Sequence, residues 1–236
     1  MKHVLAIAVL GVCVAHGAWA QSLCTSDGRA APATLVEHFV SADCEACWGA
    51  PQSGPARPRS IRLDWIVPGL QGDDAPLAAI ASRDALLRLE ALGRTAPDTS
   101  LVASSKVLRN RAHRVRVAQG PAVGAYIGSI IELRTDHPIR PQEPLSAWLL
   151  LVESVAAGSE GTTVQRNVVR NVLVSTWSKP DRSSPEGRYF FHELRPLSIP
   201  EGAQAQRLRV VGWVQDARGR VLGAAESACA RPIDAN

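Results

Sequence analysis

Apolar and polar positions along the chain change character near residue 120. Before it, runs of β-branched and aromatic residues that end in polar turns predict buried strands, and one stretch carries an apolar stripe with helical spacing. The predicted elements are strands over 34–40, 61–67 and 99–103, and a helix over 77–92 that ends at Gly93. The basic stretch 105–119 predicts either a short helix capped by Ser105 or an exposed connector.

After residue 123 the pattern is that of strands only. Six candidate strands are separated by turn signals, and they cover 126–135, 145–155, 164–177, 189–197, 206–215 and 221–227. This regular spacing favours an antiparallel β-sandwich lying against the first half. The alternative is that these strands extend the first sheet, so that the chain forms one α/β body.

The first 20 residues have the pattern of a secretory signal peptide. A positive start is followed by an apolar run over 4–15 and by Ala18-Trp19-Ala20, which is typical of a cleavage site. The apolar run is too short to span a membrane, and no other stretch could do so. Val12 before Cys13 argues against a lipid-anchored start. We therefore expect a periplasmic or secreted protein that begins at Gln21.

Four cysteines remain after cleavage: Cys24, Cys44, Cys47 and Cys229. An even number in an exported protein is consistent with a fully paired set, which allows three connectivities. Pairing of Cys44 with Cys47, and of Cys24 with Cys229 near the two chain ends, is the favoured arrangement.

The C-x-x-C at Cys44–Cys47 directly follows the first predicted strand. A strand that ends in this motif presents a dithiol at the edge of a sheet, where it can be reactive. A structural disulfide and half of a zinc site are the alternatives, although no second pair of ligands follows. Three prolines and two glycines over 49–58 leave room for at most one helical turn after Cys47. A shortened helix also predicts a less depressed thiol pKa at Cys44.

Charge and motifs exclude several other functions. The chain has 26 basic and 22 acidic residues, and removal of Lys2 with the signal leaves a net charge of +3. That is too small to indicate nucleic-acid binding. Hydrolase, nucleotide-binding and metalloprotease motifs are absent, and His137 and His192 stand alone. No cofactor or metal is predicted.

Two interpretations are possible for a polar group in the second half, which consists of Arg166, Asn167 and Arg170. In a strand, Arg166 and Arg170 share one face, which predicts either a recognition surface or a solvent-facing side with charge pairing.

Several segments resemble one known family. They are VEHFVSADCEAC, with Glu37, Phe39, Ser41, Cys44 and Cys47 on the family pattern; RLDWIVPG, with Asp64 and Trp65; RNVVR at 166–170; and LGAA at 222–225. The chain thus resembles a secreted bacterial thioredoxin-like family of unknown function (domain of unknown function 1223). The resemblance implies an α/β thioredoxin-like domain over 21–120, in which the prolines and glycines shorten the first helix. The strand spacing predicts that an antiparallel β-sandwich-like region over 121–236 follows it.

The resemblance also implies a thiol-disulfide oxidoreductase acting on a protein client. Cys44 would be the attacking thiolate and Cys47 the resolving thiol, with Glu37, His38, Trp48 and Asp64 around them. Pro97 is the candidate for the cis-proline that holds a substrate backbone in thioredoxins. A non-catalytic periplasmic binding module with structural disulfides is the alternative function, and the oligomeric state is left open.

Overall fold

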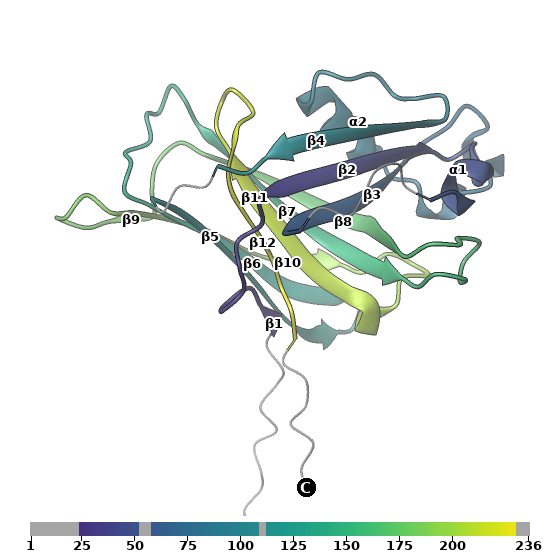
Figure 1. Cartoon of the computed structure of the whole chain (residues 1–236). Coiled ribbons are helices and arrows are strands. Elements are labelled where there is room, and N and C mark those ends of the chain that lie inside the picture. The colour runs from purple at the N-terminus through teal and green to yellow at the C-terminus, as the bar shows by residue number, and fades with distance from the viewer. Residues whose placement is uncertain (1–23, 52–57, 109–111, 230–236) are drawn as a thin grey trace, which may run out of the picture.

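The described residues form two β-sheets, with little helix. A computed structural model describes residues 24–51, 58–108 and 112–229 (Figure 1). The large sheet has the strand order β12-β11-β7-β8-β3-β2-β4, and the small sheet has the order β1-β5-β6-β10-β9. The strands of the large sheet are β2 (Thr34–Ser41), β3 (Ser60–Val67), β4 (Ser100–Lys106), β7 (Leu145–Val155), β8 (Arg166–Trp177), β11 (Leu208–Gln215) and β12 (Val221–Glu226). Those of the small sheet are β1 (Cys24–Thr25), β5 (His113–Val123), β6 (Tyr126–Thr135), β9 (Arg182–Ser183) and β10 (Tyr189–Ser198).

The large sheet joins strands from both halves of the chain. β2 and β3 lie parallel, and β4 pairs antiparallel with the outer side of β2. β3 then pairs parallel with β8, through the single register pair Asp64 and Val168, and β7, β11 and β12 continue the sheet in antiparallel fashion. The first two predicted strands are therefore part of the same sheet as most of the later ones.

The predicted fold class is wrong. An α/β thioredoxin-like domain followed by a separate sandwich does not describe a protein that is mostly β, with two α-helices among its described residues. The alternative in which later strands extend the first sheet describes the large sheet better. The predicted division at residues 120 and 121 falls within β5.

An apolar core fills the space between the two sheets. Side chains of β7 and β11 on one face of the large sheet, such as Leu149, Leu151 and Val210, pack against Val117, Ile131 and Phe191 of the small sheet. Gly212 permits this approach, because a Cβ there would lie 2.8 Å from Val117 Cγ1.

The opposite face of the large sheet is covered by α2 (Arg83–Ala91), which packs Ala85 and Leu89 onto it. The predicted helix over 77–92 is shorter than expected. It begins after Ser82, whose hydroxyl accepts a hydrogen bond from the Asp84 amide at 3.1 Å, and Gly93 ends it with a φ of 62°. Leu77 lies before it in an apolar cluster at the end of the sheet.

The basic stretch 105–119 is neither a helix nor a connector where the structure describes it. Its second part forms β5, in which Val115 and Val117 alternate with Arg114 and Arg116. Valine disfavours helix and suits a pleated surface that is buried on one side, so alternation decided the conformation here.

Most of the other predicted strands are confirmed, with changes of a few residues at their ends. The spans 126–135 and 145–155 coincide with β6 and β7. The expected limit of one helical turn at the C-x-x-C is also confirmed, although α1 (Glu45–Gly49) begins inside the motif and not after it. Short 3-10 turns cover Gly72–Asp74, Ala78–Ile80 and Ala205–Arg207. The predicted signal peptide and Gln21 lie outside the described residues.

Both expected disulfides are present. Cys24 pairs with Cys229, with Cα atoms 3.9 Å apart, and Cys44 pairs with Cys47, with Cα atoms 5.3 Å apart. Cys24 lies in β1 next to β5, so the first bridge fastens the chain segment after β12 to the small sheet. Disulfides of this kind persist in an oxidising, extracellular environment.

Candidate functional site

The Cys44–Cys47 disulfide lies at the carboxyl end of β2. The Cys44 amide donates to the carbonyl oxygen of Ser41 at 3.0 Å, and Cys44 is the residue that precedes the first turn of α1. Asp43 in the same turn accepts a hydrogen bond from the Leu70 amide at 2.7 Å. A Cβ on Gly69 would lie 2.2 Å from the Asp43 carboxylate, so glycine permits this close contact between the turns after β2 and β3.

The two cysteine residues of this disulfide are only partly buried. Cys44 and Cys47 are both half-buried, whereas Glu45 and Ala46 between them are exposed. Cys47 packs against the apolar cluster that contains Trp48, Ile66 and Val168. The disulfide is thus packed on this cluster through Cys47 and is flanked by the exposed residues Glu45 and Ala46.

Arg166 of β8 anchors the helix that carries the motif. Its side chain is 0% exposed, and its Nη2 atom donates to the carbonyl oxygens of Cys47, Trp48 and Ala50 at 3.2, 2.6 and 2.5 Å. The guanidinium group also lies over the Trp48 ring, 5.2 Å from its centroid. A cation at the C-terminal end of a helix satisfies carbonyl groups that have no partner in the helix and complements its dipole.

Asp64 of β3 compensates the buried charge of Arg166. Arg166 Nη1 donates to Asp64 Oδ1 at 3.1 Å, and the Asn167 amide donates to Asp64 Oδ2 at 2.8 Å. His38 of β2 completes the cluster, with its Nδ1 atom 3.1 Å from Asp64 Oδ1 and 3.3 Å from Arg166 Nη1. Buried charges require such partners, because an unpaired ion in the interior is very unfavourable.

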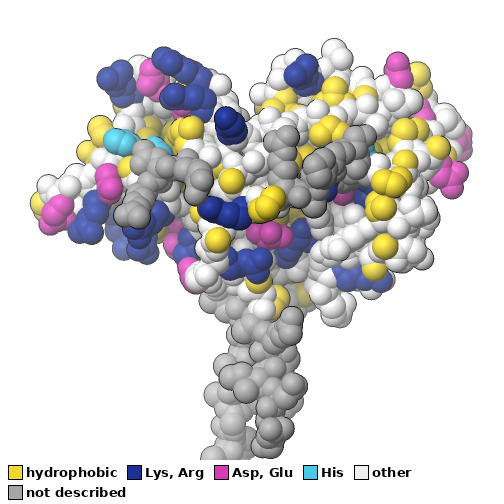
Figure 2. All heavy atoms as spheres, viewed as in Figure 1, with side chains coloured by type: hydrophobic (Ala, Val, Ile, Leu, Met, Phe, Trp, Pro, Cys, Tyr) yellow, Lys and Arg dark blue, Asp and Glu magenta, His cyan; other side chains and the backbone are white. Residues whose placement is uncertain are grey.

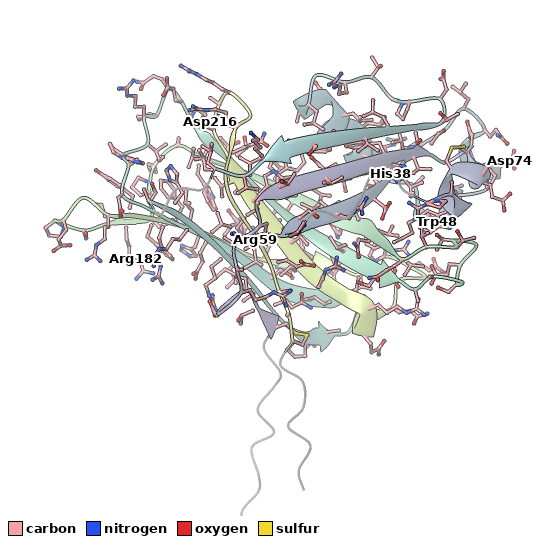
Figure 3. All side chains as sticks on the ribbon, in the orientation of Figure 1. His38, Trp48, Arg59, Asp74, Arg182 and Asp216 are labelled. Carbon is pink, nitrogen blue, oxygen red and sulfur yellow. A yellow bond between two sulfur atoms is a disulfide. The ribbon has the colours of Figure 1, made fainter. Side chains whose placement is uncertain are left out.

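Two further contacts hold α1 from the loop before β8. Trp48 is 2% exposed, and its Nε1 atom donates to the carbonyl oxygen of Glu160 at 2.7 Å. The Thr163 hydroxyl donates to the carbonyl oxygen of Gly49 at 2.6 Å. Figure 3 labels Trp48 at α1 and His38 at the neighbouring strands. The motif is therefore held by β8 and its loop as well as by β2.

The structure brings together most of the predicted site residues but not all of them. Cys44, Cys47, Trp48, His38 and Asp64 belong to one connected region through Arg166. Glu37 does not join it, because successive side chains of a strand point to opposite faces.

Glu37 belongs to a separate cluster under α2. It accepts two hydrogen bonds from Arg88, at 2.8 and 2.7 Å, and both side chains are buried. The Arg88 guanidinium group lies over the rings of Trp148 and Trp213 at 4.8 and 4.9 Å and donates to Gln215. This pair holds α2 on the sheet and has no contact with the disulfide.

Pro97 lies in the segment that leads into β4. The carbonyl oxygen of Thr99 accepts a hydrogen bond from the Ser41 amide at 2.8 Å, so this segment borders the end of β2 that carries the motif. All peptide bonds in the described residues are trans, including the one that precedes Pro97. The cis-proline expected from the family resemblance is therefore not present at this position.

The solvent-facing side predicted for Arg166 and Arg170 is wrong, although both arginines form the predicted charge pairs. Neither lies on a solvent-facing side: Arg166 is buried, and Arg170 forms an ion pair with the buried Glu153 at 2.6 Å. The sequence drew attention to Arg166 but did not predict its burial or its contacts with the C-x-x-C region. Its place between polar Gln165 and Asn167 carries no local signal of burial, because the carboxylate and the carbonyl groups that it binds are more than 100 residues away in the chain.

Among the described residues, no group of three or more His, Cys, Asp or Glu side chains is arranged to hold a metal ion. No helix in that part of the chain is long and apolar enough to cross a membrane. The chain matches no family model, no curated protein and no solved structure with which it was compared. The resemblance to the thioredoxin-like family of unknown function thus stays a prediction.

Proposed function

We propose that Cys44 and Cys47 form a redox-active pair that exchanges with the thiols of a protein client outside the cytoplasm. The observation that carries this proposal is the partly exposed disulfide on a helix that other contacts already hold in place. Export through a signal peptide over residues 1–20 and a periplasmic or secreted location are part of the proposal.

As a purely structural bridge, the Cys44–Cys47 disulfide would add little to the stability of the fold. Cys24 and Cys229 are 205 residues apart, and in the chain-entropy model closing such a loop stabilises the fold by about 5 kcal/mol. Cys44 and Cys47 are three residues apart, for which the same model gives only about 2 kcal/mol. Arg166, Trp48 and Thr163 fasten α1 without the disulfide, so its opening leaves the surrounding structure intact.

The exchange follows the ordinary route of thiol-disulfide chemistry. A client thiolate attacks the Cys44 sulfur, a mixed disulfide forms, and Cys47 leaves as a thiolate that takes up a proton. A second client thiolate then attacks the client sulfur of the mixed disulfide, and Cys44 is released as a thiol. Two electrons pass from the client dithiol to the Cys44–Cys47 pair. In the reverse direction Cys44 is the nucleophile and Cys47 resolves the intermediate.

The local electrostatics favour slow exchange. α1 has five residues, so few peptide dipoles are aligned toward a thiolate at Cys44, and the carboxylate of Glu45 is adjacent to it. The trans peptide bond before Pro97 removes the backbone geometry with which thioredoxins hold a substrate. We therefore expect a weak oxidoreductase.

The test is client trapping with a matched pair of variants. Cys47→Ala leaves Cys44 able to form a mixed disulfide that nothing resolves, so disulfide-linked adducts are expected on a non-reducing gel. Cys44→Ala is the control and traps nothing under the same conditions. A Cys44 thiol that does not react at neutral pH, together with an absence of adducts from Cys47→Ala, would contradict the proposal.

A non-catalytic module with two structural disulfides is the second candidate function. The observation in its favour is the trans peptide bond before Pro97. The reduction potential of the Cys44–Cys47 pair separates the two functions: a value below about −300 mV is typical of structural disulfides, and a higher value favours exchange.

A further inference from the structure

A hollow rich in arginine is lined by the segment after β1 and by residues of β5, β6 and β12, and its lining includes neither cysteine of the Cys44–Cys47 disulfide. It has a volume of about 790 Å³, and its rim carries Arg29, Arg59, Arg114, Arg116 and Arg134 together with His113. Figure 3 labels Arg59 near the centre of the molecule, and Figure 2 shows basic and acidic side chains gathered in the middle of this face. Pockets of this size are typical of small-molecule sites.

Two acidic side chains of the hollow are already paired. Asp27 and Glu132 lie 2.8 and 3.7 Å from Arg116, and the hydrogen bond from Arg116 is the main cause that lowers the pKa of Asp27. Five arginines against these two carboxylates leave the hollow with a net charge of +3. An anion is therefore the favoured occupant.

The side chains of Arg29 and Arg114 have no hydrogen-bond or ion-pair partner among the described residues, and both residues are exposed. The guanidinium group of Arg134 lies over the Phe190 ring, with its Cζ atom 5.9 Å from the ring centroid. Two uncommitted guanidinium groups can each offer a planar pair of N–H donors, which matches the geometry of a carboxylate or a phosphate group.

The inner wall of the hollow is apolar. Val107, Val115 and Ala224 line it, and Pro32 and Leu108 extend this surface toward the rim. A ligand that fills the hollow therefore meets hydrocarbon inside and cations outside.

The backbone conformation of Arg59 is an independent observation in favour of a ligand site at the rim. Its φ is 60°, in the left-handed region that residues other than glycine rarely adopt. Its Nε atom donates to the carbonyl oxygen of Ala31 at 3.0 Å, and its own carbonyl oxygen accepts from the Ala33 amide at 2.7 Å. Backbone conformations of this kind persist where the surroundings enforce them, and they are concentrated at ligand sites.

We propose that this hollow binds a small organic anion, with a carboxylate or phosphate group held by Arg29 and Arg114 and an apolar body against Val107, Val115 and Ala224. The site is independent of the redox function, because its lining residues include none of Cys44, Cys47, His38 or Arg166.

Calorimetric titration of the mature protein at low ionic strength tests the proposal. Octanoate and octyl phosphate serve as probes, and octanol and inorganic phosphate supply the apolar body and the anion separately. We expect one octyl anion to bind per chain, more weakly as salt is added, and with higher affinity than either comparator. Measuring both probes shows which anionic group the site prefers.

Arg29→Gln and Arg114→Gln are each expected to weaken binding of the octyl anions by about fivefold, the effect of one exposed charge-assisted contact. Both side chains are exposed, so these variants should fold, which circular dichroism checks. Arg83→Gln is the matched control, since Arg83 is exposed on α2 at the other face of the large sheet, and it should bind like the native protein. Failure of both octyl anions to bind, equal affinity for octanol or for inorganic phosphate, or unchanged binding in Arg29→Gln and Arg114→Gln would overturn the proposal.

Discussion

At the scale of single residues, Arg166 determines how the C-x-x-C region is built. It contacts three carbonyl oxygens around the end of α1, the Trp48 ring and the Asp64 carboxylate, and it is fully buried. A charge in this position is tolerated only because every side of the guanidinium group is satisfied.

Arg166→Met should therefore destabilise the protein by about 3–5 kcal/mol, because it leaves the Asp64 carboxylate buried without its cation. Urea unfolding measures this loss. Arg195→Met is the control: Arg195 pairs with Glu193 on an exposed face, and its loss should change stability by less than about 1 kcal/mol. In a double-mutant cycle with Asp64→Leu, the two changes should be less harmful together than the sum of the single losses. Additive losses would contradict the pairing.

His113 predicts a pH dependence of stability. Burial, and then the charge of nearby His137, lower its pKa, whereas Asp136 acts in the opposite direction. The folded protein therefore binds a proton at His113 less readily than the unfolded chain, whose histidine pKa is about 6.5. The stabilisation is present above that pH and is lost as the pH falls below it toward the folded pKa.

His113→Gln should accordingly flatten the loss of stability below about pH 6.5. In the native protein the His113 Nδ1 atom lies 2.9 Å from the Thr135 hydroxyl, and a glutamine side chain can retain this contact in part. Urea unfolding at a series of pH values gives the comparison. The unfolding free energies of native protein and variant should run parallel above pH 7 and diverge in acid. If they also run parallel in acid, His113 does not contribute to the pH dependence.

At the scale of elements, small residues set how closely the sheets approach one another. Gly223 of β12 faces β5, and a Cβ there would lie 2.8 Å from Val115 Cγ2. The first and second halves of the chain meet in the large sheet where β3 pairs with β8, and these two strands share one register pair. The Asp64 side chain reinforces this pairing by accepting a hydrogen bond from the Asn167 amide.

Gly223→Ala should destabilise the protein by about 1–3 kcal/mol, because the added methyl group forces β5 away from β12. Thermal or urea unfolding detects the change. Val115→Ala removes the obstructing methyl groups, so the combination of Gly223→Ala with Val115→Ala should lose less than the sum of the two. If the combined loss equals that sum, the contact across the sheets is not the cause.

At the scale of the whole molecule, the two disulfides have different roles. Cys24–Cys229 fastens the two ends of the described chain together beside the small sheet, whereas Cys44–Cys47 closes a ring within one helical turn. Figure 1 shows β1 and the end of the chain after β12 lying side by side.

Replacing Cys24 and Cys229 by alanine should cost about 2–5 kcal/mol of unfolding free energy, and replacing Cys44 and Cys47 about 2 kcal/mol at most. The reason is the length of loop that each bridge closes in the unfolded chain. Unfolding in denaturant under non-reducing conditions compares the two double variants directly. An equal or reversed order of losses would contradict these separate roles.

The sequence by itself determined the features that depend on local pattern. Alternation set the spans of β6 and β7, prolines and glycines limited α1 to one turn, and cysteine parity with position along the chain predicted both disulfides. Each of these follows from steric limits or periodicity within a short window. The set of residues expected around the two cysteines was only partly right: His38, Trp48 and Asp64 lie in one connected region with them, whereas Glu37 pairs with Arg88 elsewhere.

Only the tertiary structure decided which strands became neighbours and which polar side chains were buried. Period-two alternation identifies the two faces of a strand but not its partner, so the pairing of β3 with β8 had no local signal. Arg166 and Arg88 are buried because partners distant in sequence, Asp64 and Glu37, meet them in space. Such compensation is a property of the assembled sheets, and for this reason the fold class and the site's central arginine could not be predicted from the chain alone.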